Sequence, residues 1–387
     1  MLGIDHVWVW TANACLIGAA VGCLYTGLAA VLPLRFARGR GKAPSPAHYA
    51  PPVTVLVPLC GDEPGLASRL RALCTQDYPS PVQVLCGIAD TADPAIATVN
   101  RLAAALPAGV LELHVEPREH GRNRKISNLT NMVEHARYDT FVMIDSDIAV
   151  GPDYLARVVG ALDEPGVGAV TCVYYGVAEG GLWAKLSAMA INLQFLPSAI
   201  VALRYGLARP CFGATIAIKA ATLREIGGLV RFADQLWDDY AIGEAVRSAG
   251  YRVATSALAL GHVCSDASAR ELFARQLRYA RTIHGIDPPR KFGAVIAHPF
   301  PLALLGLLLG GGHLAVALTL VALTSRVTLA ACVAHRFRDS SVSYWLVPLR
   351  DLAAFAVYVM SFFGGTVTWR GQRYRVRADG TLLQASR

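Results

Sequence analysis

The uncharged stretch at residues 11–34 constrains the fold of this chain more than any other feature. A helix of this length, at a rise of about 1.5 Å per residue, would cross the roughly 30 Å of a bilayer's hydrocarbon core. The basic run RFARGRGK follows at 35–42. Because basic flanks stay in the cytoplasm, we expect a membrane anchor at 1–40 with its N-terminus outside. A cleaved signal peptide is the alternative, but the apolar stretch is too long and no small-residue cleavage site follows it.

A second apolar region begins after Lys291. No charged residue appears from 292 to 325, and another apolar segment covers 352–369. We expect membrane segments within 291–369 and a basic cytoplasmic tail at 370–387. Because four full crossings would leave that tail outside, one C-terminal segment is expected to be re-entrant or interfacial. Arg350 and Asp351 make 352–369 the candidate.

The composition supports a membrane protein and restricts its partners. Hydrophobic residues make up 54% and charged residues 17% of the 387, which is too apolar for an ordinary soluble enzyme. A net charge of +8 suits an anionic membrane surface or a substrate that carries phosphate. Nucleic acid is not expected, because no Lys/Arg-rich run is interleaved with aromatic residues. The nine cysteines form no CxxC pair, so reduced thiols are expected.

Between the apolar ends, a proline-rich linker at 41–52 leads to a segment of globular composition at 53–268. Its apolar runs alternate with helical patterns. We expect strands at 53–59, 82–88, 111–116, 140–145 and 166–175, with helices at 64–74 and 94–105. This alternation is typical of a Rossmann-like α/β domain with a mostly parallel sheet. Ligands of such sheets bind at the carboxyl ends of the strands.

Four acidic pairs along this segment need one explanation: Asp62 with Glu63, Asp90 with Asp93, Asp145 with Asp147, and Asp238 with Asp239. On a strand, residues i and i+2 share a face, so the carboxylates of Asp145 and Asp147 would point one way. Two like charges side by side are costly unless a positive charge lies between them. An Asp-x-Asp pair suits a hard divalent cation that also binds a diphosphate. Hydrated acids at a strand end are the alternative.

A basic helix is expected within ARQLRYART, residues 274–282. It would place Arg275, Arg278 and Tyr279 on one face, where two guanidinium groups could clamp a diphosphate. We therefore treat 269–290 as an interfacial helix. A basic helix that only rests on anionic lipid is the alternative.

A basic loop is expected within HGRNRKISNLTN, residues 120–131. Arg122, Arg124 and Lys125 come just before an expected helix start, with Ser127 as a possible cap. A basic loop at a helix N-terminus attracts phosphate, and an ordinary solvated loop is the alternative.

The order of these motifs resembles a known family. The series Asp90/Asp93, Asp145-Ser146-Asp147, Asp239 and Arg275-x-x-Arg278-Tyr279 resembles the D, D, D, (Q/R)xxRW pattern of family 2-like inverting glycosyltransferases, specifically the ceramide glucosyltransferase group, family 21. GRNRKISNLTNM, GVGAVTCVYYG, AMAINLQFLPS, LARPCFGATIA and FADQLWDDY are together most similar to the bacterial hopanoid-biosynthesis-associated glycosyltransferases. The resemblance covers nearly the whole chain. It implies a GT-A-type catalytic domain at 53–268 with N-terminal and C-terminal transmembrane helices.

The resemblance also implies residue roles. Asp90, Asp93, Lys125, Asp145, Arg275, Arg278 and Tyr279 would bind the nucleotide sugar, Asp145 and Asp147 would hold Mg²⁺ or Mn²⁺, and Asp239 would be the general base. Tyr279 stands where the pattern has Trp, and Leu196-Pro197 stands where animal ceramide enzymes have His-Pro. The sequence does not decide between Asp238 and Asp239 as the base. His262 is either a further metal ligand or a structural histidine.

The function implied by the resemblance is transfer of a sugar from a UDP-sugar to a lipid hydroxyl at the cytoplasmic face of a bacterial inner membrane. The first choice is N-acetylglucosamine and bacteriohopanetetrol, and the alternative is glucose and ceramide. A processive polysaccharide synthase would usually need more membrane helices. A lipid transporter would need ionisable residues within its spans.

Overall fold

The computed structural model describes residues 2–36, 50–286, 290–339, 342–363, 366–369, 372–376 and 381–384. Most of the predicted linker and parts of the predicted basic tail therefore lie outside the described residues. The chain divides into two compact units. The α/β unit comprises 37–175 and 208–263, and the helical unit comprises 1–36, 176–207 and 264–387.

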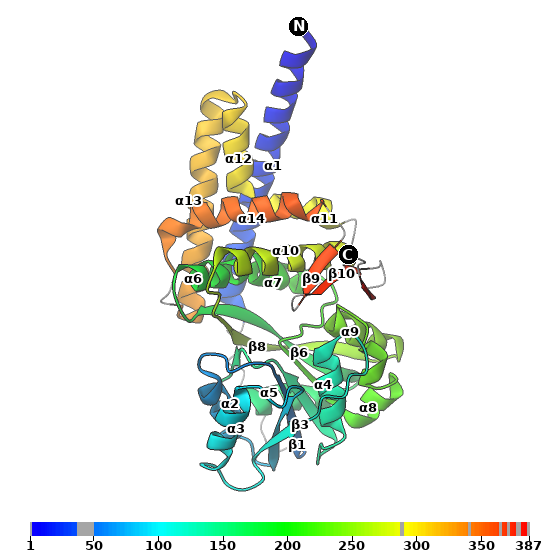
Figure 1. Cartoon of the computed structure of the whole chain (residues 1–387). Helices are drawn as coiled ribbons and strands as arrows, with labels where there is room; N and C mark the ends of the chain where they lie inside the picture. Colours follow the sequence, from blue (N-terminus) through cyan, green and yellow to red (C-terminus); the bar gives the residue numbers. More distant parts are fainter. Residues whose placement is uncertain are drawn as a thin grey trace. The chain divides into compact units, whose positions relative to one another are not determined.

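The α/β unit is built on one eight-stranded sheet in the order β3-β2-β1-β4-β7-β6-β8-β5 (Figure 1). The strands are β1 (Val53–Leu59), β2 (Val82–Ile88), β3 (Leu111–Val115), β4 (Thr140–Ile144), β5 (Ile148–Ala149), β6 (Val167–Ala178), β7 (Thr215–Lys219) and β8 (Arg252–Cys264). β3, β2, β1 and β4 pair in parallel, as the alternating pattern predicted. β7 pairs antiparallel with β4 and β6, and β5 pairs antiparallel with β8, so the sheet is mixed. The carboxyl ends of the four parallel strands meet at one edge.

Helices cover both faces of this sheet. They are α2 (Leu66–Cys74), α3 (Ala95–Ala103), α4 (Arg124–Val133), α5 (Tyr154–Gly160), α8 (Ala220–Glu225) and α9 (Asp238–Ser248). In β1, Val55 and Val57 pack with the apolar side chains of α2, α3 and α5. Leu56, between them, packs with those of α4, α8 and α9. Because both faces of β1 are covered, the strand is an uninterrupted apolar run.

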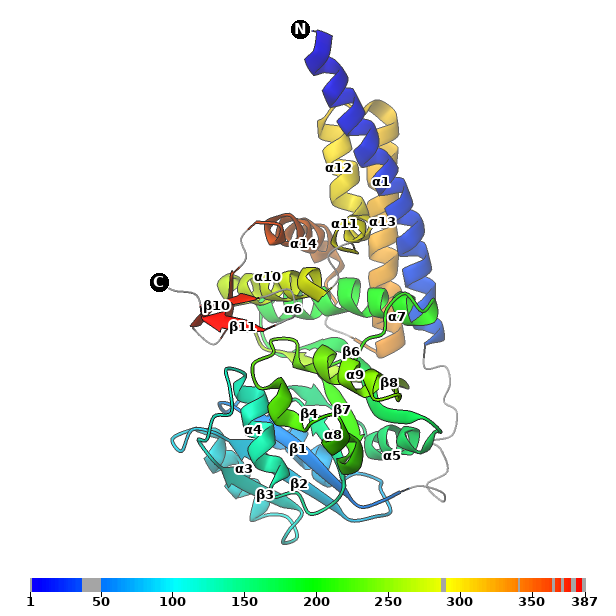
Figure 2. The ribbon, with the colours of Figure 1, turned by 90° about the vertical axis from the view of Figure 1, so that its right-hand side faces the viewer.

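The helical unit contains α1 (Leu2–Arg35), α6 (Leu182–Ala190), α7 (Leu196–Arg204), α10 (Ala269–Ile286), α11 (Arg290–Gly293), α12 (Pro299–Leu308), α13 (Gly312–Phe337), α14 (Val347–Ser361) and the small sheet β9 (Thr366–Trp369), β10 (Gln372–Val376) and β11 (Leu382–Gln384). α1, α12 and α13 lie side by side (Figures 1 and 2). Small residues allow this approach. A Cβ atom on Gly22 would lie 2.6 Å from the carbonyl oxygen of Ile296, and one on Gly306 would lie 2.7 Å from Leu16 Cδ2.

In the part of the chain that the structure describes, three helical segments are long and apolar enough to cross a membrane: His6–Arg35, Leu182–Arg204 and Gly312–Phe337. The pair Lys291–Ala297 and Pro299–Leu308 would also qualify as one span, but it is bent by 82°. α14 has 15 residues and runs across the direction of α1, α12 and α13 (Figures 1 and 2). At about 1.5 Å per residue it is shorter than a bilayer core of roughly 30 Å. The re-entrant or interfacial placement of 352–369 stays a prediction.

The segment Leu182–Arg204 was not expected to belong with the membrane helices, because it falls within the predicted domain at 53–268. A π-helical turn, Ile191–Phe195, joins α6 to α7. Within it, Asn192 accepts a hydrogen bond from Gly176 N at 2.7 Å and donates one to Gly176 O at 2.9 Å. These two hydrogen bonds hold Gly176, the first residue of segment 176–207, against the π-helical turn of the same segment.

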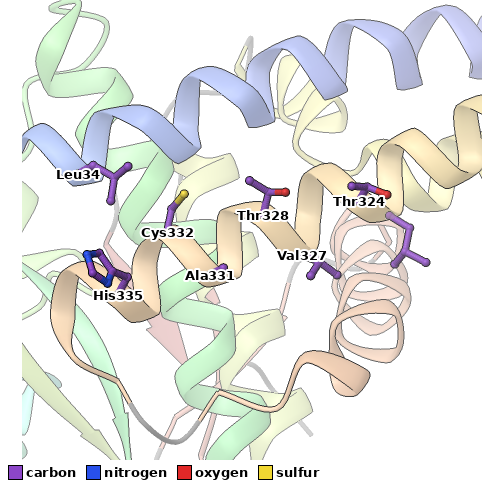
Figure 3. Close-up of a pocket in the computed structure, with 8 residues that line it drawn as sticks. Leu34, Thr324, Val327, Thr328, Ala331, Cys332 and His335 are labelled. Carbon is purple, nitrogen blue, oxygen red and sulfur yellow. The ribbon is translucent and has the colours of Figure 1, made fainter.

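An apolar groove of about 590 Å³ runs along α13 beside the end of α1 (Figure 3). Its lining residues recur at helical spacing on one face of α13 and are joined by one residue of α1: Leu323, Thr324, Val327, Thr328, Ala331, Cys332, His335 and Leu34. The groove is apolar along most of its length, and the ionisable residues in its described lining are Cys332 and His335.

Candidate active site

The Asp-x-Asp motif lies in a turn at the carboxyl end of β4. β4 ends at Ile144, and Ile148 N donates to Asp145 O at 3.2 Å, which closes a turn over 145–148. The strand argument for a shared direction of the two carboxylates is therefore wrong, because these residues do not continue the strand. The turn is held from the other side by β8, where Val263 N donates to Asp147 O at 2.8 Å.

Lys125, at the start of α4, neutralises Asp145. Its Nζ atom lies 2.5 Å from Asp145 Oδ1. Burial acts to lower the pKa of Lys125, but the carboxylates of Asp145 and Asp238 outweigh it and raise the pKa, so the lysine remains charged. Burial raises the pKa of Asp145, and the charge of Asp147 adds to this effect while Lys125 opposes it. The structure thus places Lys125, which the resemblance assigned to the nucleotide sugar, against the Asp-x-Asp motif.

Asp147 has one carboxylate oxygen that no described residue binds. Its Oδ2 atom lies 3.3 Å from His262 Nδ1. Its Oδ1 atom is buried and has no hydrogen-bond partner among the described residues. Burial acts to raise the pKa of Asp147, but His262 outweighs it and the pKa is lowered. An ionised carboxylate with an unused buried oxygen fits a hard divalent cation.

The described part of the chain contains no group of three or more His, Cys, Asp or Glu side chains arranged to hold a metal ion. Sites for Mg²⁺ often use one or two carboxylates and complete the coordination with substrate phosphates and water. Asp145 and Asp147 fit that type of site. His262, on β8, contacts both Asp147 and Tyr174. The ring centroids of His262 and Tyr174 lie 5.4 Å apart.

Asp239 lies in the first turn of α9, and the pKa of its carboxyl group is raised. Gly213 N donates to Asp239 Oδ2 at 2.9 Å, and Tyr240 N donates to Asp239 Oδ1 at 2.8 Å. Burial and the neighbouring charge of Asp238 raise the pKa of Asp239 to about 6, although Lys125 and the two amides act to lower it. A carboxyl group with a pKa near neutrality is suited to proton transfer.

Gly213 connects Asp239 to the Asp-x-Asp motif. Its carbonyl oxygen accepts a hydrogen bond from Lys125 Nζ at 3.4 Å, while its amide donates to Asp239. Ala214 O, the next carbonyl, accepts from Asp145 N at 3.2 Å. A Cβ atom on Gly213 would lie 3.0 Å from Asp239 Oδ2, so the close approach favours glycine. One short loop therefore contacts both acidic groups.

The N-terminal cap of α4, where the basic loop ends, differs from the prediction. Asn123, and not Ser127, caps α4: its side chain accepts from Ile126 N at 3.1 Å. Ser127 lies inside the helix and accepts from His120 N at 3.0 Å. Asn123 is fully buried and also donates to Gln235 O at 2.9 Å and toward Asp238 Oδ1 at 3.3 Å. The capping residue thereby fixes the basic loop against the start of α9.

The two arginines of the basic loop, Arg122 and Arg124, form ion pairs with exposed acidic residues. Arg122 lies 3.5 Å from Asp234, and Arg124 lies 3.2 Å from Glu119. Both pairs are solvent-exposed and contribute little to stability. Of the three basic residues, the structure places Lys125 alone in contact with the Asp-x-Asp motif.

Asp90 and Asp93 follow β2 and differ in their contacts. Asp93 accepts from Gly61 N and from Ala95 N, both at 2.8 Å, so it ties the loop after β1 to the start of α3. Asp90 is exposed and accepts from Ala92 N at 2.9 Å. Asp93 therefore has both oxygens occupied by backbone amides.

Arg69 on α2 was not singled out from the sequence. It is 6% exposed, and its Nε atom donates to Ser146 O at 2.6 Å, inside the Asp-x-Asp turn. Its other nitrogens reach Pro64 O at 2.8 Å and Glu63 Oε2 at 3.5 Å. Ser146 Oγ also donates to Glu63 at 3.0 Å. The sequence could have indicated that Arg69 is buried, because its spacing from Leu66 and Leu73 places it on the apolar face of α2.

The arginine motif belongs to the helical unit. α10 is helical over 269–286, as expected, and Arg275 pairs with Asp266 and with Ser187 Oγ. The Arg278 guanidinium lies 5.3 Å from the ring centroid of Tyr279, which is 48% exposed. The acidic residues belong to the α/β unit, so the predicted site residues are divided between the two units.

Comparison with known proteins finds a family that matches most of the chain and relatives that match parts of it. Residues 14–382 match glycosyl transferase family 21. Ceramide glucosyltransferase 1 of Caenorhabditis elegans is 26% identical over 212 residues, which cover 54% of this chain and 45% of that protein. The ceramide glucosyltransferase of Candida albicans is 30% identical over 122 residues, which cover 29% of this chain and 22% of that protein. The matches thus span less than half the length of these relatives.

A solved structure supports the fold. A mannosyltransferase from Pyrobaculum calidifontis, determined in complex with GDP-Man and Mn²⁺, matches with a TM-score of 0.52 and 22% identity, over 92% of this chain and 99% of that one. At this identity the likeness is one of fold. The predicted GT-A-type α/β domain accompanied by apolar helices is confirmed.

Proposed function

Because the chain belongs to glycosyl transferase family 21, we propose that it is an inverting glycosyltransferase that moves a sugar from a UDP-sugar to a hydroxyl group of a membrane lipid. One observation carries this proposal. Lys125 contacts Asp145 of the Asp-x-Asp turn and, through the Gly213 peptide, is linked to Asp239, whose pKa is about 6. A site for a diphosphate and a site for proton removal are thereby joined in one unit.

Asp239 acts as the general base in this proposal. Its carboxylate takes the proton from the acceptor hydroxyl while the oxygen attacks the anomeric carbon from the face opposite the diphosphate. The bond from the anomeric carbon to the diphosphate oxygen breaks, UDP leaves with the electron pair, and the configuration inverts. The two amides that bind Asp239 keep the carboxylate oriented.

Asp145 and Asp147 would hold Mg²⁺ or Mn²⁺, which when bound would neutralise charge on the leaving UDP. Lys125 opposes the rise in the pKa of Asp145 that burial causes, and Arg69 fixes the backbone of the turn between the two acids. Asp90 would contact the nucleotide, while Asp93 orients the loops around it. Arg275, Arg278 and Tyr279 would bind the diphosphate and cover the acceptor, which requires Arg275 to exchange Asp266 for phosphate oxygens.

The acceptor is proposed to be a lipid because the helical unit exposes apolar helices and an apolar groove. From the motifs, the first candidate is bacteriohopanetetrol with N-acetylglucosamine as the sugar. The curated relatives are named ceramide glucosyltransferases, which favours ceramide and UDP-glucose as the second candidate. We place the protein in a bacterial inner membrane with the α/β unit in the cytoplasm, where the UDP-sugar is available.

The test is release of UDP by the full chain in lipid nanodiscs with Mg²⁺ or Mn²⁺. UDP-N-acetylglucosamine and UDP-glucose are each offered with bacteriohopanetetrol and with ceramide, and the lipid product is identified by mass spectrometry. Product with one donor–acceptor pair identifies the substrates. Movement of lipid without release of UDP from any pair would instead support a transporter and refute the proposal.

A further inference from the structure

A buried ion pair joins α13 to α14 in the helical unit. Arg326 donates from Nε to Asp351 Oδ2 and from Nη2 to Asp351 Oδ1, both at 2.8 Å. The two side chains are 5% and 3% exposed. Both oxygens of Asp351 are thus bound by one guanidinium group in a bidentate geometry.

Arg350, the residue before Asp351, is buried without such a partner. It is 4% exposed, and its Nε and Nη1 atoms have no hydrogen-bond partner among the described residues. Successive residues of an α-helix point about 100° apart, so Arg350 and Asp351 face different directions. Arg350 therefore contributes a positive charge that the neighbouring ion pair does not compensate.

The helices packed against α14 offer no second buried counter-charge. Asp351 is the one acidic residue in the sequences of α12, α13 and α14, and the acidic residue of α10, Glu271, is exposed and accepts from Ala267 N at 3.1 Å. The buried His298 contacts Gln194, with 3.1 Å between their Nε2 atoms, and packs on the rings of Phe355 and Tyr358. Two arginines and one carboxylate leave a net positive charge in a buried place, which is destabilising unless an anion completes the cluster.

The residues before α14 indicate where such an anion would come from. Tyr344 and Trp345 are 46% and 74% exposed directly before the helix begins. Exposed Tyr and Trp side chains collect at the level of lipid head groups. α14 then exposes Leu349, Leu352 and Met360 along its length. These features place the start of α14 at the depth where lipid phosphates lie.

We infer that Arg350 binds a phosphate group, and that the phosphate belongs to the head group of a membrane phospholipid. The two unused donors, Nε and Nη1, lie on different edges of the guanidinium group. Each edge is completed by Nη2 into a pair of parallel N–H groups, and such a pair matches two phosphate oxygens. Basic pockets between membrane helices bind lipid head groups by the same chemistry. Free inorganic phosphate shares that chemistry and is distinguished below. The inference is independent of the transfer reaction, so either can fail without the other.

The test measures thermal unfolding of the full, delipidated chain in an alkyl maltoside detergent and phosphate-free buffer. Phosphatidylglycerol, diacylglycerol and inorganic phosphate are added separately. The variants are Arg350→Gln, Arg350→Lys and, as a matched control for loss of one positive charge, Arg338→Gln, which changes an exposed arginine at the end of α13. Native mass spectrometry counts the phospholipid that remains bound to each protein.

Phosphatidylglycerol is expected to raise the unfolding midpoint of the wild type and of Arg338→Gln, whereas diacylglycerol has no effect. Loss of charge-assisted hydrogen bonds should weaken phosphatidylglycerol binding by Arg350→Gln at least about tenfold. Arg350→Lys should bind with intermediate affinity, which keeps the test valid if Arg350→Gln does not fold. An equal response to inorganic phosphate would support the site and identify free phosphate as its source. A wild-type response of either Arg350 variant, or equal destabilisation of Arg350→Gln with and without lipid, would overturn the inference.

Discussion

The raised pKa of Asp239 leads to opposite effects of one substitution on activity and on stability. Asp239→Asn removes the proposed base, and loss of a positioned general base lowers kcat by roughly 10²- to 10⁴-fold. In the wild type, activity should rise with pH through about 6 as the carboxyl group loses its proton. The measurement is the pH dependence of UDP release at saturating donor and acceptor.

The stability of the folded chain should change in the other direction. A pKa of about 6 in the folded state, against about 3.9 for an ordinary aspartate, means that this carboxyl group favours folding when protonated and that this contribution is lost as pH rises through about 6. This difference in pKa lowers the free energy of unfolding by at most about 3 kcal/mol at about pH 8 and by almost nothing at about pH 4. Asparagine offers one acceptor oxygen to the two amides, and this cost does not depend on pH. At about 2–4 °C per kcal/mol, the unfolding midpoint of Asp239→Asn relative to that of the wild type should therefore be several degrees higher at about pH 8 than at about pH 4.

Asp238→Asn is the matched control. It removes the charge that raises the pKa of Asp239, so the acidic limb of the activity profile should move to lower pH while the alkaline plateau persists. Asparagine retains an oxygen for the hydrogen bond from Asn123. The reasoning about Asp239 is refuted if Asp239→Asn remains active, or if the two variants have the same activity profile.

Three further predictions concern the Asp-x-Asp turn. Lys125→Met leaves Asp145 buried without its ion-pair partner, so the KM for the donor should rise about 10- to 100-fold in steady-state assays. Arg69→Met leaves Ser146 O and Pro64 O without their buried donor, so denaturant titration should show a loss of roughly 1–3 kcal/mol, whereas a surface change such as Arg122→Met should cost less than about 1 kcal/mol. Asp147→Asn should weaken UDP binding in excess Mg²⁺ at least about tenfold but strengthen it in chelator, as measured by calorimetry; weakening under both conditions would contradict a metal role for Asp147.

Much of the α/β unit could be predicted because its strands are buried on both faces. β1 and β2 have the predicted bounds, since a run such as VTVLVPL cannot be exposed on either side. The alternation with helices also gave the parallel half of the sheet. The antiparallel half could not be predicted in the same way, because β7 and β8 pair with strands that are distant in the chain.

The contacts that shape the site were harder to predict, because they join residues far apart in sequence. Asn123 was missed as the cap of α4, although asparagine is a preferred capping residue, since its burial depends on Gln235 and Asp238. Arg69 acts on Ser146, which is 77 positions away. The position of the acidic motif at a strand end was predictable, whereas the turn that positions its carboxylates depends on pairing with β8.

The charge balance around the turn explains why UDP binding should respond to Asp147→Asn with opposite sign in the presence and absence of metal. Burial and the charges of Asp147 and Asp145 together raise the pKa of Glu63, so these carboxylates lie within one electrostatic neighbourhood. Among the described residues around the turn, Lys125, Arg69 and a protonated His262 supply three positive charges. They face five carboxyl groups: Glu63, Asp145, Asp147, Asp238 and Asp239. A diphosphate entering this site alone would meet net repulsion. Removal of one carboxylate charge reduces that repulsion, but it also removes the unused oxygen that a divalent cation would bind, so the gain without metal and the loss with metal have the same origin.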